Sequence, residues 1–245
     1  MVCNSGTSLV PTIDGQIHHF SNVGLYDALF VMQDSETKTL WNHITGEAVY
    51  GPLVGRTLGP IGNLLQMSVK QALEMDPKME IAISDRVYFA GGRQFGTASA
   101  GADRLAGSGL TQTQLSDRFV GTLGEEDLRR SRMELGLGVW TGTTRRYYSM
   151  ASIRDRGRAF LDQLDGRKVL IYIDPETNNP AALFVNASTA KMQDKDILLD
   201  NGAVVRSGVL LDRGGKRKAA ERPQQIFTRW YGFALTFPGC EVFGE

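Results

Sequence analysis

Short apolar runs alternate with turn-forming residues along the first fifty residues. Turn signals recur at Asp14-Gly15, at residues 22–24, at residues 34–38 and at Thr45-Gly46. Brief runs punctuated in this way are typical of a β meander. Residues 28–33 are apolar almost throughout, which favours a strand buried on both faces, whereas residues 39–43 alternate around Trp41.

Helical spacing of apolar residues occurs in two places. The first is residues 63–75, where Asn63 could cap the helix and Pro77 lies beyond its end. The second is residues 152–164, where Ser152 could cap the helix and Asp165-Gly166 would end it. We therefore expect two short helices.

The remaining regular segments have the β-branched and aromatic residues of strands. They are residues 79–90, 135–148, 169–173, 182–186, 197–199, 204–211 and 227–237. No fixed period repeats among them, which disfavours a solenoid or a propeller. The pattern predicts a β-rich α+β fold, with one or more antiparallel sheets of short strands covered by about two helices.

Composition changes within residues 91–124, which are rich in Gly, Ala, Ser and Thr. Such a segment buries little apolar area to offset the entropy of ordering its backbone. We interpret it as a flexible insertion in a single domain of residues 1–245. A hydrophobic content of 42% over 245 residues is enough for that domain to build its own core.

The charge balance narrows the range of partners. The 27 basic and 27 acidic residues leave a formal net charge of zero, so no overall field attracts a polyanion. We expect a small-molecule partner and no nucleic acid, and leave the oligomeric state open. No run reaches the roughly 18 apolar residues of a membrane span, and no signal peptide is evident, so the chain as written is expected to be cytoplasmic.

A set of residues spread along the chain resembles a known bacterial family. Residues 2–6 read VCNSG, and Gly24, Asp34, Trp41 and Thr45-Gly46 follow with distinctive spacing, with further matches as far as residues 241–243. This pattern is similar to the family catalogued as domain of unknown function 3179, over nearly the whole chain. The resemblance implies no established activity. Its members often look exported or lipid-anchored and commonly carry C-x-x-C where this chain has only Cys3, so a native protein with an upstream signal would be exported.

Nucleophilic chemistry could be carried by Cys3, together with Asn4 and Ser5. A thiol becomes a nucleophile when a nearby cation or imidazole lowers its pKa. All three histidines, His18, His19 and His43, lie within the first 43 residues. Because His18 and His19 are adjacent on a predicted strand, only one of them can face a given site. The alternative is that Cys3 and Cys240 are ordinary free thiols, which we favour over a bridge between them.

The same residues could bind a metal. Cys3, one of His18 or His19, His43 and Asp27 offer thiolate, imidazole and carboxylate donors suited to zinc or copper. The close ligand spacing of known zinc motifs is missing from the sequence, so no cofactor is predicted.

Paired carboxylates are a third possibility. Asp27, Asp34 and Glu47 fall within the family-like region, and two of them held about 5 to 9 Å apart could hydrolyse a glycosidic bond. Turn capping explains Asp34 and Glu47 without any catalytic role. Asp27 lies before an apolar run, where a buried carboxylate needs a partner.

Two functions follow from these candidates. The first, which we prefer, is a small-molecule binding or accessory domain with a pocket near Cys3, Asp27 and Trp41, to which Asn4, Ser5 and Tyr26 contribute. The alternative is a small-molecule hydrolase that uses Cys3 or two of the three carboxylates, with His18 or His43 as the base. Whether the protein is an enzyme is left open by the sequence.

Overall fold

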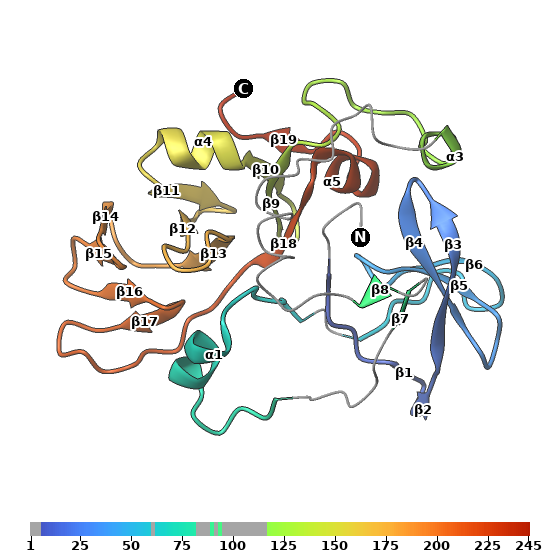
Figure 1. The fold of residues 1–245 in the computed structure, drawn as a ribbon, viewed down its shortest axis with the longest axis horizontal. Coiled ribbons are helices and arrows are strands. Elements are labelled where there is room, and N and C mark those ends of the chain that lie inside the picture. The colour runs from blue at the N-terminus through green and yellow to red at the C-terminus, as the bar shows by residue number, and fades with distance from the viewer. Residues whose placement is uncertain (1–5, 60–61, 82–88, 91–92, 95–116) are drawn as a thin grey trace.

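Several antiparallel sheets and a few short helices make up the fold (Figure 1). The computed structural model describes residues 6–59, 62–81, 89–90, 93–94 and 117–245. Over these residues the chain is β-rich with four short helices, as the sequence predicts in outline. No helix among them is long and apolar enough to cross a membrane.

Residues 12–50 form the predicted meander. A small hairpin of β1 (Thr12–Ile13) and β2 (Gln16–Ile17) precedes four antiparallel strands, β3 (Phe20–Tyr26), β4 (Leu29–Asp34), β5 (Leu40–Asn42) and β6 (Ala48–Tyr50). The ends of β4 are buried, but its four middle residues are only half-buried. Complete burial of this strand on both faces was therefore a wrong prediction, because β3 beside it is mostly exposed.

A second sheet lies at the centre of the molecule (Figure 1). Its order is β18 (Gln224–Arg229), β9 (Leu135–Trp140), β10 (Arg145–Ser149) and β19 (Glu241–Val242), with β19 parallel to β10. Helix α5 (Trp230–Thr236) follows β18 directly and packs against β9. The prediction of a strand over residues 227–237 is thus wrong after Arg229, since the aromatic residues there are spaced for one face of a helix.

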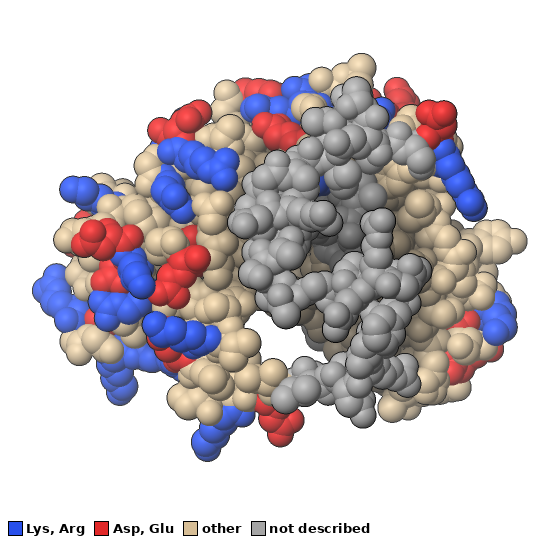
Figure 2. Space-filling model, viewed as in Figure 1, with Lys and Arg blue, Asp and Glu red and all other residues tan. Residues whose placement is uncertain are grey.

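Two further sheets follow the central sheet along the chain. The first contains β11 (Ala159–Leu164), β12 (Arg167–Ile173) and β13 (Pro180–Phe184), and the second contains β14 (Ala190–Gln193), β15 (Asp196–Leu199), β16 (Val204–Arg206) and β17 (Val209–Leu211). All pairs in both sheets are antiparallel hairpins. In Figure 2 acidic and basic side chains are interspersed over this side of the molecule, so the face in view has no large patch of one sign.

The second predicted helix is much shorter than expected. Helix α4 (Met150–Asp155) is capped by Ser149, whose side chain accepts a hydrogen bond from the backbone N–H of Ser152. Gly157 and Arg158 then adopt positive φ angles of 76° and 66°, which end the helix. Residues 159–164 form strand β11 instead.

The first predicted helix is also shorter. Helix α1 (Val69–Met75) is capped by Ser68 and Gln71, which form a capping box, and it ends at Asp76, before Pro77. Asn63 is therefore not its cap. The Asn63 side chain instead hydrogen-bonds the backbone of Pro223 and Gln225.

The segment between α1 and β9 is described only in part. Of the expected strand 79–90, residues 82–88 lie outside the described residues, and β7 (Phe89–Ala90) pairs with β8 (Arg93–Gln94). Of the expected insertion 91–124, residues 91–92 and 95–116 also lie outside them. Its last part contains helix α3 (Asp117–Val120), and Phe119 and Leu123 pack against the core around α5.

Candidate functional site

One group of predicted residues meets at the turn between β4 and β5. Asp34 is the last residue of β4, and both it and Trp41 are fully buried. The Asp34 carboxylate accepts hydrogen bonds from the backbone N–H of Thr37 (2.5 Å), from the Thr37 hydroxyl (2.8 Å) and from the Trp41 indole N–H (2.8 Å). Burial raises the pKa of Asp34, but the bonds from Trp41 and Thr37 outweigh it and hold the pKa at about 2.

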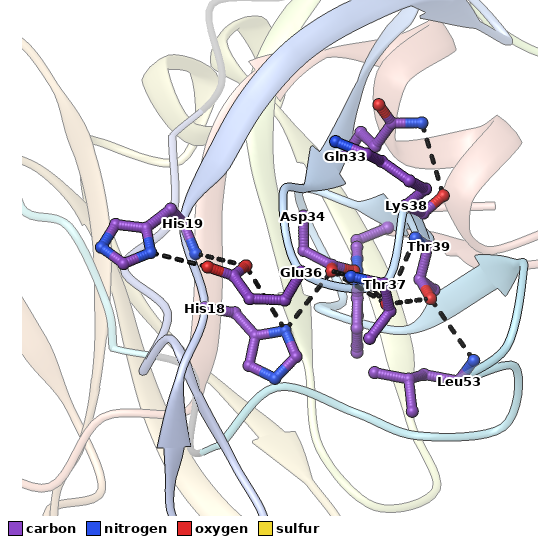
Figure 3. Close-up of polar contacts among 10 residues, drawn as sticks. His18, His19, Gln33, Asp34, Glu36, Thr37, Lys38, Thr39 and Leu53 are labelled. Carbon is purple, nitrogen blue, oxygen red and sulfur yellow. Dashed lines mark hydrogen bonds and ion pairs between the residues drawn. The ribbon is translucent and has the colours of Figure 1, made fainter.

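His18 lies against this carboxylate. It follows β2, and its backbone N–H donates to the Pro11 carbonyl, which turns the side chain inward. The ring is 4% exposed, and Nδ1 lies 3.4 Å from Asp34 Oδ1 and 3.8 Å from Glu36 Oε2 (Figure 3). Nδ1 is buried without a hydrogen-bond partner among the described residues.

Glu36 completes the group, and sequence reasoning missed it. Its side chain, 21% exposed, is held by the backbone N–H of His19 (2.9 Å) and by His19 Nδ1 (2.7 Å). The hydrogen bonds from the His19 side chain and backbone lower the pKa of Glu36. His19 itself is 78% exposed, yet both its ring and that of His18 reach the Glu36 carboxylate, so the expectation that only one of the two can face a given site is not met at Glu36. Glu36 lies beside the histidines because the Ser35 N–H donates to the His19 carbonyl. Only this pairing of the two segments could have indicated Glu36.

The other two carboxylates lie elsewhere. Asp27 has a positive φ of 52° in the turn before β4, and burial raises its pKa. Asp27 and Asp34 flank opposite ends of the strand, roughly 20 Å apart at about 3.3 Å per residue. Glu47 is exposed in the turn before β6, near the Thr45 hydroxyl. The structure therefore does not bring Asp27 and Asp34 together as a pair, and Tyr26 beside Asp27 is exposed.

The thiol candidates are described only in part. Cys3, Asn4 and Ser5 lie outside the described residues, so a Cys–His pair remains a prediction. His43 Nδ1 lies 3.0 Å from the Phe30 carbonyl oxygen, and the ring lines a concavity of about 330 Å³ that Gly6 also lines. Cys240 is a buried free thiol, and burial raises its pKa to about 11.

A separate cavity of about 370 Å³ lies between the α1 segment, the β12–β13 turn and the central sheet. Its apolar walls come from sequence-distant segments, and it has seven polar side chains. The apolar residues are Leu64, Leu65, Met67, Leu137, Pro180, Ala181 and Phe227, and the polar ones are Gln66, Gln71, Tyr172, Asp174, Asn179, Ser207 and Gln225. Gly6 lines this cavity as well. None of these residues was among the sequence candidates.

Buried polar contacts fix the walls of this cavity. The Gln71 side-chain amide donates to both oxygens of Asp174 (3.0 and 3.1 Å), which ties α1 to the β12–β13 turn. Asp174 Oδ1 also accepts from the backbone N–H groups of Glu176 and Thr177. The Gln225 side chain bonds both backbone groups of Ala182, which joins the central sheet to β13. Among the described residues, Asp174 Oδ2 accepts only the Gln71 bond, so it keeps acceptor capacity.

Comparison with known families identifies the chain. The model of the family described as "Protein of unknown function (DUF3179)" matches residues 1–233 of the 245. The chain belongs to the DUF3179 family. The resemblance stated from the sequence is thereby confirmed. No curated protein and no solved structure matches the chain.

The DUF3179 match spans both candidate sites, the His18–Asp34–Glu36 group and the cavity. Of the predicted residues, the structure brings together His18, Asp34 and Trp41 in the first site. That site joins one imidazole to two carboxylates, a donor set that could hold a cation. The cavity offers enclosed apolar volume with a few fixed polar groups, which suits a small molecule.

Proposed function

We propose that this DUF3179 chain is a small-molecule binding domain whose ligand occupies the cavity beside Gln71 and Asp174. The observation that carries the proposal is a concavity of about 370 Å³ with apolar walls and a few fixed polar groups. Ligand sites in proteins are concave, mostly apolar and about 300 to 1,000 Å³ in volume. The buried bonds of Gln71 and Gln225 hold this cavity open before any ligand binds.

The lining residues indicate the chemistry of the ligand. Asp174 is the one ionisable acid among the described lining residues, and no Lys or Arg accompanies it there. Its Oδ2 atom faces a donor from Gln71 and can accept a second one. Leu65, Met67 and Phe227 provide apolar contact. We expect an apolar body that carries one amine or hydroxyl donor, and expect carboxylates to be rejected.

This cavity differs from the pocket that the sequence suggests. Trp41 has no exposed surface and belongs to the meander core, so its ring is used in packing. The hydrolase alternative used either Cys3, which lies outside the described residues, or two nearby carboxylates, and the separation of Asp27 from Asp34 along β4 favours binding over the carboxylate chemistry. Gly6, the last residue of the family-like VCNSG run, borders the cavity, which supports a link between that run and this site.

A pair of methionine variants tests the proposal. Met67→Trp adds bulk at the cavity wall, while Met79→Trp makes the same change at an exposed position outside it. The probes are alkylamines, the matching alcohols and the matching carboxylates, measured by thermal shift and calorimetry. We expect amines or alcohols to raise the Tm of the wild type and of Met79→Trp, and to leave the Tm of Met67→Trp unchanged.

Two results would contradict the proposal. One is that no amine or alcohol stabilises the wild type at millimolar concentration. The other is that Met67→Trp, shown by its urea midpoint to be folded, binds the probes as well as the wild type does.

A further inference from the structure

We propose that His18, Asp34 and Glu36 bind one divalent transition-metal ion, with zinc preferred. Each side chain offers one ligand atom, and the three atoms lie within 4.8 Å of one another. The site lies in the N-terminal meander, and none of its residues lines the cavity of the proposed function. Failure of one proposal would therefore not affect the other.

The distances between the donor atoms fit a metal better than they fit hydrogen bonds. His18 Nδ1 lies 3.4 Å from Asp34 Oδ1 and 3.8 Å from Glu36 Oε2. Two donors bound to zinc at 2.0–2.1 Å in a tetrahedron are separated by about 3.3 Å. A charge-assisted N–H···O bond would instead bring the atoms to about 2.7–2.9 Å. The three ligand atoms lie within 4.8 Å of one another, and a small movement of Glu36 towards the other two ligands would complete the coordination.

The imidazole nitrogen supplies evidence that is independent of the carboxylates. His18 Nδ1 is buried and makes no hydrogen bond among the described residues; its contacts with Asp34 and Glu36 are the longer ion-pair distances drawn in Figure 3. A buried polar atom without a partner costs about 1 to 3 kcal/mol, so such atoms are rare in folded proteins. The nitrogen points between two carboxylate oxygens, and a cation there would satisfy it.

Surrounding groups fix both carboxylates in place. The Trp41 indole and Thr37 donate to Asp34, and the His19 backbone and ring hold Glu36. Outer hydrogen bonds of this kind orient the ligands of metal sites and preserve their geometry before the ion binds. The Asp34 bond to Trp41 also anchors the site in the hydrophobic core of the meander.

The negative charge of the two carboxylates also favours a bound cation. Among the described residues, the ion pairs of Asp34 and Glu36 involve only His18 and His19, and no Lys or Arg neutralises them. Two carboxylates and a neutral imidazole carry a charge of −2, which a divalent ion balances. The partly exposed Glu36 side chain provides access from solvent, and the fourth position of a tetrahedral ion would be taken by water.

The donor types select the metal. Calcium and magnesium prefer oxygen ligands only, whereas imidazole suits zinc and other late transition metals. With one nitrogen and two oxygens at these spacings, the set matches three protein ligands of a four-coordinate zinc ion.

The test uses the purified full chain after treatment with a chelator. Zinc is titrated by calorimetry, and bound metal is counted by mass spectrometry after washing. We expect one zinc ion per chain and little competition from calcium or magnesium. Cobalt substitution should give the strong visible absorption of a four-coordinate site. Substoichiometric zinc in the wild type would overturn the proposal.

Matched variants locate the site. Glu36→Gln keeps one of the two acceptor oxygens that face His19 and removes the charge, and Glu47→Gln makes the same change at an exposed turn of the same meander. We expect at least tenfold weaker zinc binding in Glu36→Gln and none in His18→Gln, while Glu47→Gln and His43→Gln bind as the wild type does. Because Glu36 lies in a partly exposed turn, its variant should fold even if His18→Gln does not. Wild-type affinity in Glu36→Gln would overturn the assignment.

Discussion

The carboxylate of Asp34 organises the turn between β4 and β5. One oxygen accepts from the Thr37 backbone and both accept from its hydroxyl, which closes the turn, and the second oxygen holds the Trp41 indole. An indole N–H buried in an apolar core needs such an acceptor. Asp34 therefore determines both the course of the chain and the position of the largest core side chain in the meander.

The stability of the protein should therefore depend on pH through Asp34. Its pKa is about 2 in the folded state against an ordinary value of 3.8, so its contribution is complete above about pH 4 and is lost as the pH falls towards 2. The loss should be about 2 kcal/mol, measured by urea unfolding in the presence of a chelator. The His18 ring faces this carboxylate and also lies near Glu36.

Asp34→Asn should remove this part of the pH dependence, because an amide does not ionise in this range. It should also destabilise the protein by about 1 to 3 kcal/mol at pH 7, since asparagine has one acceptor oxygen and cannot accept from both the Thr37 N–H and the Trp41 indole. Asp14→Asn, at an exposed position paired with Arg56, is the control and should keep the wild-type acid profile. An unchanged profile in Asp34→Asn would contradict the argument.

At the scale of elements, local pattern predicted hairpins well and misassigned two segments. The turn residues predicted the meander, and the apolar run predicted strand β12. The segment 159–164 was predicted as helix because its apolar residues also fit helical spacing. Asp165-Gly166, taken as a helix end, is the tight turn of the β11–β12 hairpin, with φ angles of 47° and 76°.

The opposite error occurred at α5. Its aromatic residues favour strands by propensity, yet Trp230, Phe233, Ala234 and Phe237 follow the i, i+3, i+4, i+7 spacing of a helix. All four pack in the core against the central sheet and the base of the meander. Tertiary burial of the apolar face thus outweighs propensity, and the spacing was the better signal.

The docking of α5 on the central sheet depends on Gly138 in β9. A Cβ atom at this position would lie 2.1 Å from Phe233 of α5, far inside van der Waals contact. Gly138→Ala should therefore displace the helix and cost at least about 1 to 3 kcal/mol, the usual penalty of overpacking. Urea unfolding followed by tryptophan fluorescence measures this.

Gly142→Ala is the matched control, since a Cβ atom there meets nothing within 4 Å and the residue has no positive φ angle. It should change the free energy of unfolding by less than about 0.5 kcal/mol. Equal stability of the two variants would show that α5 does not pack on Gly138 as described.

At the scale of the whole molecule, long-range polar contacts join segments that local pattern cannot relate. Gln71 binds Asp174, Asn63 binds the backbone of Pro223 and Gln225, and Arg217 donates to the last carbonyls of α1. These partners lie more than a hundred residues apart, and Gln71, Asp174 and Gln225 among them line the cavity. The sequence therefore indicated His18, Asp34 and Trp41 within one meander, but missed the cavity and Glu36, whose positions depend on tertiary register.

The Asn63 contact provides a test of how the α1 segment is held. Asn63→Ala removes two hydrogen bonds and leaves the Gln225 N–H without its acceptor, at a cost of about 1 to 3 kcal/mol. Because Asn63 precedes α1, the loss of its hydrogen bonds should increase local opening of this segment more than global unfolding. Hydrogen exchange of peptides from residues 63–75 and 222–229 should become faster, while exchange in the meander stays unchanged. Asn22→Ala removes only a bond to Gly24 two residues away and should leave both peptides protected as in the wild type. If the two variants exchange alike, the α1 segment is held by its apolar contacts alone, and the cavity wall does not depend on Asn63.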